Sequence, residues 1–342
     1  MNIKLLSLNV RGLRNSDKRR QIFRWLKRFH DGGNCFTFLQ ETHSTHKDEE
    51  IWKREWGSKI SFSHGSSVSK GVAILFPLKY NCNVIEELQA ESGRKLTLHL
   101  DFDGERVTLV NLYAPTQDNT EQHLSFIRSL REDICDTNCN VIFGGDFNLY
   151  ISNELDKDKG ASQQFSPAAT ELSNILNETN YIDIWRVKNP DKRRYTWRRN
   201  NPLVQSRLDY WLIPTELIYD VEKCNILPSI KTDHSLITLC INSSNDGKRG
   251  PGLWKFNDAL LKDEYYVYFM KDKIKKLKQE HCSDENKAMT WELIKMEIRN
   301  STIAYSKQKS KMQKQVENYL NAQLEILSET LDNKYDDAVD ER

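Results

Sequence analysis

The stretch "NVIFGGDFNLY", residues 140–150, has apolar residues typical of a strand near its beginning, followed by glycines and polar residues that are not. Its apolar run VIF predicts a buried strand. Two glycines, Asp146 and Asn148 then follow almost without a break. Because glycine has no side chain, we expect the pair to let the backbone and a substrate approach Asp146 closely. A P-loop is excluded, since no GxxxxGK[ST] pattern follows the glycines.

Polar residues end several other strand-like runs of this chain. They are Asn9, Gln40, Glu41, Tyr113, Asp209, Asp233 and His234. Functional groups in layered sheets gather at such positions, where loops leave the rigid scaffold. Each residue alone has a structural explanation, such as a helix cap, an ion pair or a buried hydrogen bond. Together with Asp146 they predict one polar site.

These residue types match the needs of phosphodiester hydrolysis. That reaction requires a metal to neutralise phosphate charge, a base for the attacking water and a donor beside a phosphate oxygen. Glutamate, aspartate, asparagine and histidine supply those groups. Mg²⁺ prefers hard oxygen ligands and keeps several waters, so one or two carboxylates suffice to hold it.

The order of elements predicts the fold class. From residue 1 to residue 241, short strand-like runs alternate with amphipathic helical stretches, and a DG pair at residues 103–104 predicts a hairpin turn. This pattern favours an α/β (α+β) sandwich with helix-covered sheets. Residues 242–252, "NSSNDGKRGPG", predict a linker, because they are polar and rich in glycine and proline.

Residues 253–342 predict a helical extension. Within them an apolar stripe recurs at spacings of three and four residues: Val316, Leu320, Leu324, Leu327 and Leu331. The stripe spans too few heptads to favour a coiled coil over a helix packed on a neighbour, so we expect the packed helix. The basic run from Lys271 to Lys278 leaves contact with DNA open as another role for this extension.

Composition excludes several classes of protein. The chain of 342 residues has no apolar run long enough to cross a bilayer, and its first residues lack the layout of a signal peptide. Its seven cysteines are irregularly spaced without a CxxC pair, which argues against a disulfide framework and a cysteine zinc site. We therefore expect an unsecreted protein of the nucleus or cytosol.

A net charge of +1 means that any nucleic-acid binding must depend on local patches. The clearest patch is residues 188–201, "KNPDKRRYTWRRNN". Its candidate DNA contacts are Arg193, Arg194, Trp197, Arg198 and Arg199. Arginines interleaved with aromatic residues suit backbone contact and base stacking, although a solvated charged turn explains the same cluster.

Six motifs occur here in the order typical of one superfamily: LSLNVRGLR, LQETH, NLYAP, GGDFN, SRLDYWL and TDHSLI. Through them residues 1–241 resemble the endonuclease/exonuclease/phosphatase superfamily. LQETH, GGDFN and "RRYTWRR…SRLDYWL" look most like the apurinic-type endonuclease domain of LINE-type non-LTR retrotransposon polyproteins. The resemblance implies a four-layered sandwich of two packed mixed β-sheets flanked by helices. It also implies that this chain is an N-terminal fragment leading toward a reverse transcriptase.

The resemblance assigns roles to the residues of the metal and the attacking water. Glu41 would be the principal Mg²⁺ ligand, with Asn9 near the metal and the phosphate, and Mn²⁺ would substitute. Asp146 would orient and activate the water. Asn148 would hold that water or a phosphate oxygen.

The resemblance also assigns roles around the scissile phosphate. Tyr113 would hydrogen-bond it, and His234, oriented by Asp209, would donate to it. Asp233 would support the metal or the leaving group. Thr196 and Arg207 fall near positions that touch DNA in the family.

One position departs from the repair-type abasic endonucleases. They carry an acidic residue two positions after the first-motif asparagine, where this chain has Arg11. A single metal held chiefly by Glu41 is therefore expected. The expected activity is nicking of intact duplex DNA, which leaves a 3′-hydroxyl that primes reverse transcription, with element RNA and a reverse transcriptase as further partners.

Other functions remain open at this level. They are an abasic-site repair endonuclease, an RNA-directed nuclease of the same superfamily, a phosphatase for small or lipid substrates, and an inactive DNA-binding module. The complete set of catalytic residue types argues against the inactive module, and the arginine and aromatic patch argues against a small substrate.

Overall fold

The computed structural model of this chain describes residues 2–30, 33–80, 82–89, 92–116, 120–135, 139–157, 166–200, 203–242, 255–281 and 287–340. Its Cα atoms form two compact units, residues 1–245 with 327–342 and residues 246–326. The linker predicted at 242–252 lies, except for its first residue, outside the described residues.

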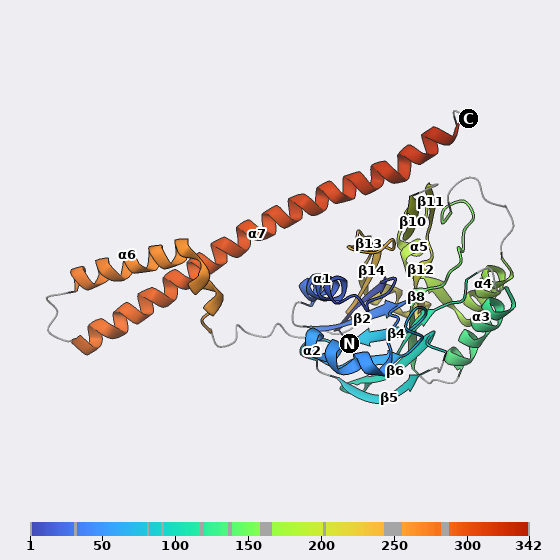
Figure 1. Ribbon diagram of the computed structural model, residues 1–342, viewed down its shortest axis with the longest axis horizontal. Helices are drawn as coiled ribbons and strands as arrows, with labels where there is room; N and C mark the ends of the chain where they lie inside the picture. The colour runs from blue at the N-terminus through green and yellow to red at the C-terminus, as the bar shows by residue number, and fades with distance from the viewer. Residues whose placement is uncertain are drawn as a thin grey trace. The chain divides into compact units, whose positions relative to one another are not determined.

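The first unit contains two six-stranded mixed sheets (Figure 1). One has the strand order β13-β14-β1-β2-β4-β3, with β1 Asn2–Asn9, β2 Asn34–Gln40, β3 Ile60–Ser63, β4 Val72–Leu75, β13 Val221–Leu227 and β14 Leu236–Asn242. The other has the order β5-β6-β7-β8-β12-β9, with β5 Asn83–Gln89, β6 Lys95–Phe102, β7 Glu105–Tyr113, β8 Asn140–Asp146, β9 Tyr181–Asp183 and β12 Asp209–Pro214. A separate hairpin pairs β10 Trp197–Asn200 with β11 Leu203–Ser206.

Helices cover the outer faces of the two sheets (Figure 1). The first sheet is covered by α1 Ser16–Leu26 and α2 Glu49–Trp56, and the second by α3 Thr120–Cys135 and α4 Pro167–Thr179, while the short α5 is Ile184–Lys188. Four 3₁₀ segments complete the elements: η1 Lys27–Phe29, η2 His46–Asp48, η3 Thr215–Asp220 and η4 Asp258–Lys262. The predicted four-layered α/β sandwich is therefore confirmed.

The alternation of side chains along β1 explains the layers. Ile3 and Leu5 point into the core between the sheets, whereas Leu6 and Leu8 pack against the helical layer. A strand directs successive side chains to opposite faces, so a strand that is apolar at both sets of positions is buried on both sides. Such strands form a rigid platform for the polar residues at their ends.

The strand of the GGDFN motif continues through both glycines to Asp146. A Cβ atom added to Gly144 would lie 2.0 Å from the Trp211 ring, and one added to Gly145 would lie 2.0 Å from the Leu112 carbonyl oxygen. The prediction that these glycines allow close approach of backbone is confirmed, whereas the prediction that they admit substrate was wrong, because Leu112 and Trp211 fill the space. The glycines let neighbouring strands and a core tryptophan pack closely, and so fix the position of Asp146.

The second unit is a helical hairpin. Helix α6, Glu264–Glu280, packs against part of α7, Lys287–Asp340, through Tyr266, Met270 and Ile298. The Tyr266 hydroxyl lies 2.7 Å from Thr302 Oγ1. In the part of the chain that the structure describes, no helix is long and apolar enough to cross a membrane.

The apolar stripe of α7 is not packed as predicted. Val316, Leu320 and Leu324 are 47–60% exposed, and Leu327 is exposed to a similar extent. The side chain of Leu331 lies outside the described residues. Since α6 packs on an earlier part of α7, the three- and four-residue spacing marks an amphipathic face that has no neighbour within this hairpin.

We predict that Gly144→Ala destabilises the nuclease unit by about 1–3 kcal/mol or more, because overpacking a rigid core costs that amount. Gly33→Ala is the matched control, since a Cβ there would meet no atom within 4 Å. Denaturant unfolding of both variants measures the difference. Equal free energies of unfolding would contradict the close-packing role of Gly144.

Candidate active site

Three predicted site residues form a row across the second sheet. Asp146, at the end of β8, pairs in register with Tyr113 on β7 and with Asp209 on β12. Residues paired across neighbouring strands lie about 5 Å apart. The row therefore places a phenol and two carboxylates together at one edge of the sheet, although they are far apart in the sequence.

The first sheet contributes Asn9 and Glu41. Asn9 ends β1 opposite Gln40 of the parallel strand β2, and Glu41 follows Gln40 directly. The Asn9 side-chain nitrogen donates to Glu41 Oε1 at 2.8 Å and to Asp146 Oδ2 at 2.9 Å. One buried amide thus joins the two sheets and holds two carboxylates at fixed positions.

The backbone around these residues is strained. Glu41, His43, Asn148 and Arg11 all have φ between +45° and +54°, a region that residues other than glycine rarely adopt. Such strain costs of order 1–3 kcal/mol at each residue, and it persists only where surrounding contacts fix the conformation. Strained residues cluster at functional sites, which supports the assignment of this edge as the active site.

His234 lies between the two carboxylates. Its Nδ1 is 2.9 Å from Asp209 Oδ2, and its Nε2 is 3.9 Å from Asp146 Oδ2. Burial alone would lower the pKa of His234, but the charge and hydrogen bond of Asp209 outweigh burial and raise the pKa to about 9. The imidazole is therefore held as a cation at neutral pH, with its Nε2 directed toward the Asp146 side.

Asp146 has a raised pKa, because it is fully buried and because the Asp209 carboxylate repels its charge. His234 and the hydrogen bonds from Asn9 and the Asn148 backbone act in the opposite direction. The Asn148 backbone N–H donates to Asp146 Oδ1 at 2.9 Å, and the Asn148 side-chain nitrogen donates to the Ala114 carbonyl at 2.8 Å. Asn148 thereby fixes the loop that orients Asp146.

Tyr113 faces Glu41 across the site. Burial, the charges of Glu41 and Asp146 and a hydrogen bond with Glu41 raise the pKa of the Tyr113 hydroxyl, so it stays protonated and can donate. The guanidinium of Arg94 lies 5.2 Å from the centre of the Tyr113 ring. Sequence analysis missed Arg94, because it is a single basic residue outside every motif.

Asp233 lies at the rim of the site. Its Oδ2 accepts from Arg11 Nη1 at 3.0 Å and from Trp197 Nε1 at 3.3 Å. Arg11, the position that departs from the repair enzymes, therefore neutralises a carboxylate here instead of adding one. Support of a metal or leaving group by Asp233 stays a prediction.

Three predicted DNA contacts are buried, and their assignment was wrong. Arg194 is 4% exposed, and Thr196 and Arg207 are each 1% exposed. Arg207 forms salt bridges with Asp156 and Asp183. Thr196 Oγ1 accepts from the backbone N–H groups of Leu208 and Asp209, so this side chain helps to fix the position of Asp209.

The rest of the predicted DNA-contact set stays accessible. Arg199 is exposed on the β10–β11 hairpin, and Arg193, Trp197 and Arg198 are partly exposed. The side chain of Arg198 donates to Gln205 on the paired strand. The hairpin thus presents a basic and aromatic surface.

A cavity of about 650 Å³ opens beside His234 and Asp233. Four cations line it: Arg11, Lys18, Arg198 and Lys231. Lys18 lies close enough to Asp233 and Glu41 for their charges to oppose the lowering of its pKa by burial. Lys18 and Lys231 were not among the predicted residues, since only the fold gathers these separate lysines around one cavity.

The donor set at Glu41 fits a divalent metal. Glu41 offers a half-buried carboxylate, the hard oxygen ligand that Mg²⁺ prefers. The Asn9 amide directs its nitrogen to that carboxylate, while its oxygen accepts from the Arg11 backbone N–H. Burial is the main cause of the raised pKa values of Tyr113 and Asp146, and nearby carboxylates add to it: Glu41 and Asp146 at Tyr113, and Asp209 at Asp146. A bound cation would offset this added negative charge. Asp146, Asp209 and His234 also lie close enough to share a metal, but the bond between His234 and Asp209 engages two of their ligand atoms.

Solved structures of two AP endonucleases and of one APE2 catalytic domain share this fold. LMAP from Leishmania major has a TM-score of 0.61, with 71% of this chain and 88% of that chain covered. An AP endonuclease from Archaeoglobus fulgidus has a TM-score of 0.55, and the match covers 71% of this chain and 100% of that chain. The Xenopus laevis APE2 catalytic domain has a TM-score of 0.57, and the match covers 71% of this chain and 94% of that chain. Each is 20% identical to this chain, which establishes likeness of fold.

Sequence comparison identifies a related protein and the family of this chain. The chain is 28% identical over 276 residues to the Transposon TX1 uncharacterized 149 kDa protein of Xenopus laevis, which covers 80% of this chain but only 20% of that protein. Residues 6–234 match the family described as Endonuclease/Exonuclease/phosphatase, and this span contains every residue of the site described above. The chain therefore belongs to the endonuclease/exonuclease/phosphatase family and is a phosphodiesterase of the nuclease type.

Proposed function

We propose that this chain is a Mg²⁺-dependent endonuclease that nicks duplex DNA and leaves a 3′-hydroxyl for reverse transcription during retrotransposition. The observation that carries the proposal is the His234 cation, held by Asp209 beside Asp146, at the edge of a cavity lined by four basic residues. A cationic cavity attracts a polyanion, and the adjacent acid and base groups suit hydrolysis of its phosphodiester.

In the proposed reaction, Asp146 takes a proton from the water that attacks phosphorus. Its raised pKa makes it a better base than an ordinary carboxylate, and the Asn148 N–H fixes its orientation. His234 donates from Nε2 to a phosphate oxygen, and Tyr113 donates its hydroxyl to the same phosphate. The bond from phosphorus to the 3′ oxygen breaks, and His234 Nε2 gives its proton to that oxygen, which leaves as the 3′-hydroxyl.

Mg²⁺ held by Glu41, with Asn9 beside it, would supply charge neutralisation at the phosphate when bound, and Mn²⁺ would substitute for it. Asn9 contributes a second effect of its own. Because its amide nitrogen donates to both Glu41 and Asp146, it keeps the metal-binding carboxylate and the base at a fixed separation.

The likeness to the TX1 protein supports a role in retrotransposition. This chain spans about a fifth of that transposon protein, so a reverse transcriptase and element RNA belong to the proposal as partners of a longer polyprotein. Because the target would be chromosomal DNA, we place the action of the protein in the nucleus, after its synthesis in the cytosol.

The position of Arg11 favours intact DNA over abasic DNA as the substrate. Its guanidinium pairs with Asp233 at the rim, where the repair enzymes that this chain resembles carry an added carboxylate nearby. The alternatives are an abasic-site endonuclease, an RNA-directed nuclease and an inactive DNA-binding module. Each would give a different pattern of cleavage on intact DNA, abasic DNA and RNA.

We predict nicking of intact supercoiled plasmid in Mg²⁺ and none in EDTA. Glu41→Gln should slow nicking by about 100-fold or more, because several kcal/mol of charge stabilisation are lost. Extension of the nick by a DNA polymerase tests for the 3′-hydroxyl. If wild-type protein leaves intact plasmid uncut but cleaves abasic DNA or RNA, the proposed substrate is wrong.

We predict that the wild-type rate falls as pH rises through about 9, where His234 loses its proton. Asp209→Asn removes the charge that raises the pKa of His234 while burial still lowers it, so the alkaline limit of the pH–rate profile should move to lower pH. Asp233→Asn is the control. Asp233 contributes less than Asp209 to the raised pKa of His234, so this variant should move the alkaline limit less than Asp209→Asn does. An unmoved alkaline limit in Asp209→Asn would remove His234 from the proton transfer.

We predict that Arg199→Gln with Lys231→Gln weakens DNA binding and lowers the slope of log affinity against log salt by about two, because each lost phosphate contact lowers it by about one. Binding is measured in EDTA to prevent cleavage. Arg106→Gln is the control, as an exposed cation on the β6–β7 hairpin. If the double variant keeps the wild-type slope, neither Arg199 on the hairpin nor Lys231 at the cavity contacts a DNA phosphate.

A further inference from the structure

Three side chains of the types that bind metals form a cluster outside the set of proposed catalytic residues. They are His46, which begins η2, Glu49, which begins α2, and His64, which follows β3. His46 Nδ1 and His64 Nε2 lie 3.2 Å and 3.1 Å from the same oxygen, Glu49 Oε1, and the three ligand atoms all lie within 4.8 Å of one another. No step of the proposed reaction uses this cluster.

We propose that His46, Glu49 and His64 bind a transition-metal dication of the Zn²⁺ class. Two imidazoles and one carboxylate suit such an ion, whereas Mg²⁺ prefers oxygen ligands alone. Bonds of about 2.0–2.1 Å in a tetrahedral site separate neighbouring ligand atoms by about 3.3–3.4 Å. The two separations from Glu49 Oε1 are close to that value, so small side-chain movements would complete three of four positions.

Contacts behind the cluster fix two of the ligands. His64 Nδ1 lies 3.0 Å from Ser44 Oγ, which in turn lies 2.9 Å from Thr42 Oγ1. When Nδ1 is engaged in this way, Nε2 is free to carry the lone pair, which is the arrangement typical of metal-binding histidines. Lys53 donates to Glu49 Oε2 at 2.8 Å and so leaves Oε1 directed toward the two imidazoles.

The three side chains are already in contact with one another. A ring nitrogen of each histidine lies within hydrogen-bond distance of Glu49 Oε1. The imidazoles of His46 and His64 lie edge to face, with ring centres 4.3 Å apart. A metal would replace the shared hydrogen bonds with coordinate bonds to the same atoms.

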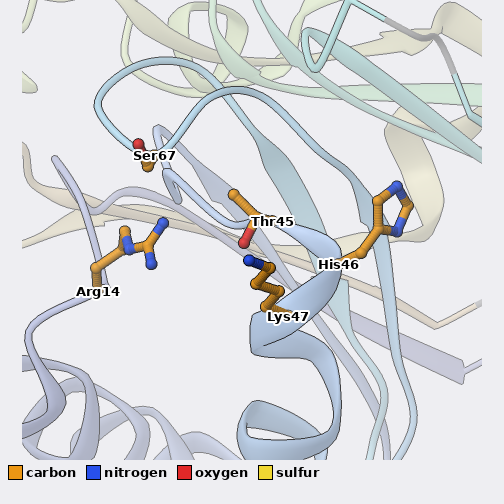
Figure 2. Close-up of a pocket in the computed structure, with 5 residues that line it drawn as sticks. All are labelled: Arg14, Thr45, His46, Lys47 and Ser67. Atoms are coloured by element: carbon orange, nitrogen blue, oxygen red, sulfur yellow. The ribbon is translucent and has the colours of Figure 1, made fainter.

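The cluster is open to solvent on one side. The His46 side chain is 85% exposed, whereas that of His64 is 10% exposed. His46 also lines a cavity of about 690 Å³ with Arg14 and Lys47, but its imidazole is turned away from those two cations (Figure 2). The hydrogen bond from the Thr45 N–H to Asp48 Oδ2, at 2.8 Å, fixes the turn that presents His46. An ion could enter here, and water could fill the fourth position.

The first test is titration of the untagged 342-residue chain with Co²⁺. Glu41→Gln serves as the background, because it removes the proposed Mg²⁺ ligand without touching the cluster. We expect one equivalent of Co²⁺ with the intense visible absorption of a tetrahedral site, and displacement of that absorption by Zn²⁺. Adding His46→Ala should weaken this binding at least tenfold. Lys47→Ala is the matched control, because it removes an exposed neighbouring side chain that is no ligand, and it should bind as its parent does.

A second measurement keeps the test independent of the folding of Glu41→Gln. Wild-type protein in excess Mg²⁺ should show the same Co²⁺ absorption, and His46→Ala in the wild-type background should lose it while it still nicks plasmid. Equal Co²⁺ affinity with and without His46, or only the weak absorption of a six-coordinate ion, would overturn the proposal.

Discussion

The Asn9 amide is the contact on which the active site depends. Its nitrogen donates to Glu41, which belongs to the same sheet, and to Asp146, which belongs to the other. Two carboxylates at such close range repel each other, and a buried charge without a partner is costly. A side chain with two N–H donors can satisfy both at once. The separation of the proposed metal ligand from the proposed base therefore follows from how the two sheets pack.

Two further carboxylates of the site, Asp209 and Asp233, each have a cationic partner. Asp209 is stabilised by the His234 imidazole, and Asp233 by the Arg11 guanidinium. Glu41 has no comparable full ion pair among the contacts described, since its nearest cation-forming group is His43 at 3.8 Å. The burial of His43 lowers the pKa of that imidazole, which makes it a poor counter-charge. Glu41 is thus the carboxylate best prepared to accept a metal ion.

Much of this arrangement was predictable from local sequence pattern. Polar residues at strand ends predicted that Asn9, Glu41, Asp146 and His234 meet, because a layered sheet brings strand ends to a common edge. The pattern did not reveal that Gly144 packs against a tryptophan, since that contact depends on the register between β8 and β12. Local pattern reports which residues end a strand, whereas register determines which of them touch.

The basic patch, residues 188–201, also shows that a local sequence pattern does not determine which side chains are exposed. Sequence composition treats Arg194, Arg199 and Arg207 alike, but one remains exposed and two are buried. Salt bridges to two carboxylates that are distant in the sequence hold Arg207, and no local signal marks those partners. A cluster of arginines therefore predicts a charged region of the fold, and burial decides which members can reach DNA.

Thr196, a buried member of that patch, connects the β10–β11 hairpin to Asp209 and His234. Thr196, just before β10, accepts from the Asp209 N–H through its hydroxyl and from the Ser235 N–H through its carbonyl. Trp197, the next residue, forms a β-bridge with His234. The hairpin that presents Arg199 is thus attached to both Asp209 and His234. Because these contacts include backbone hydrogen bonds, a displacement of the hairpin would also displace Asp209 and His234.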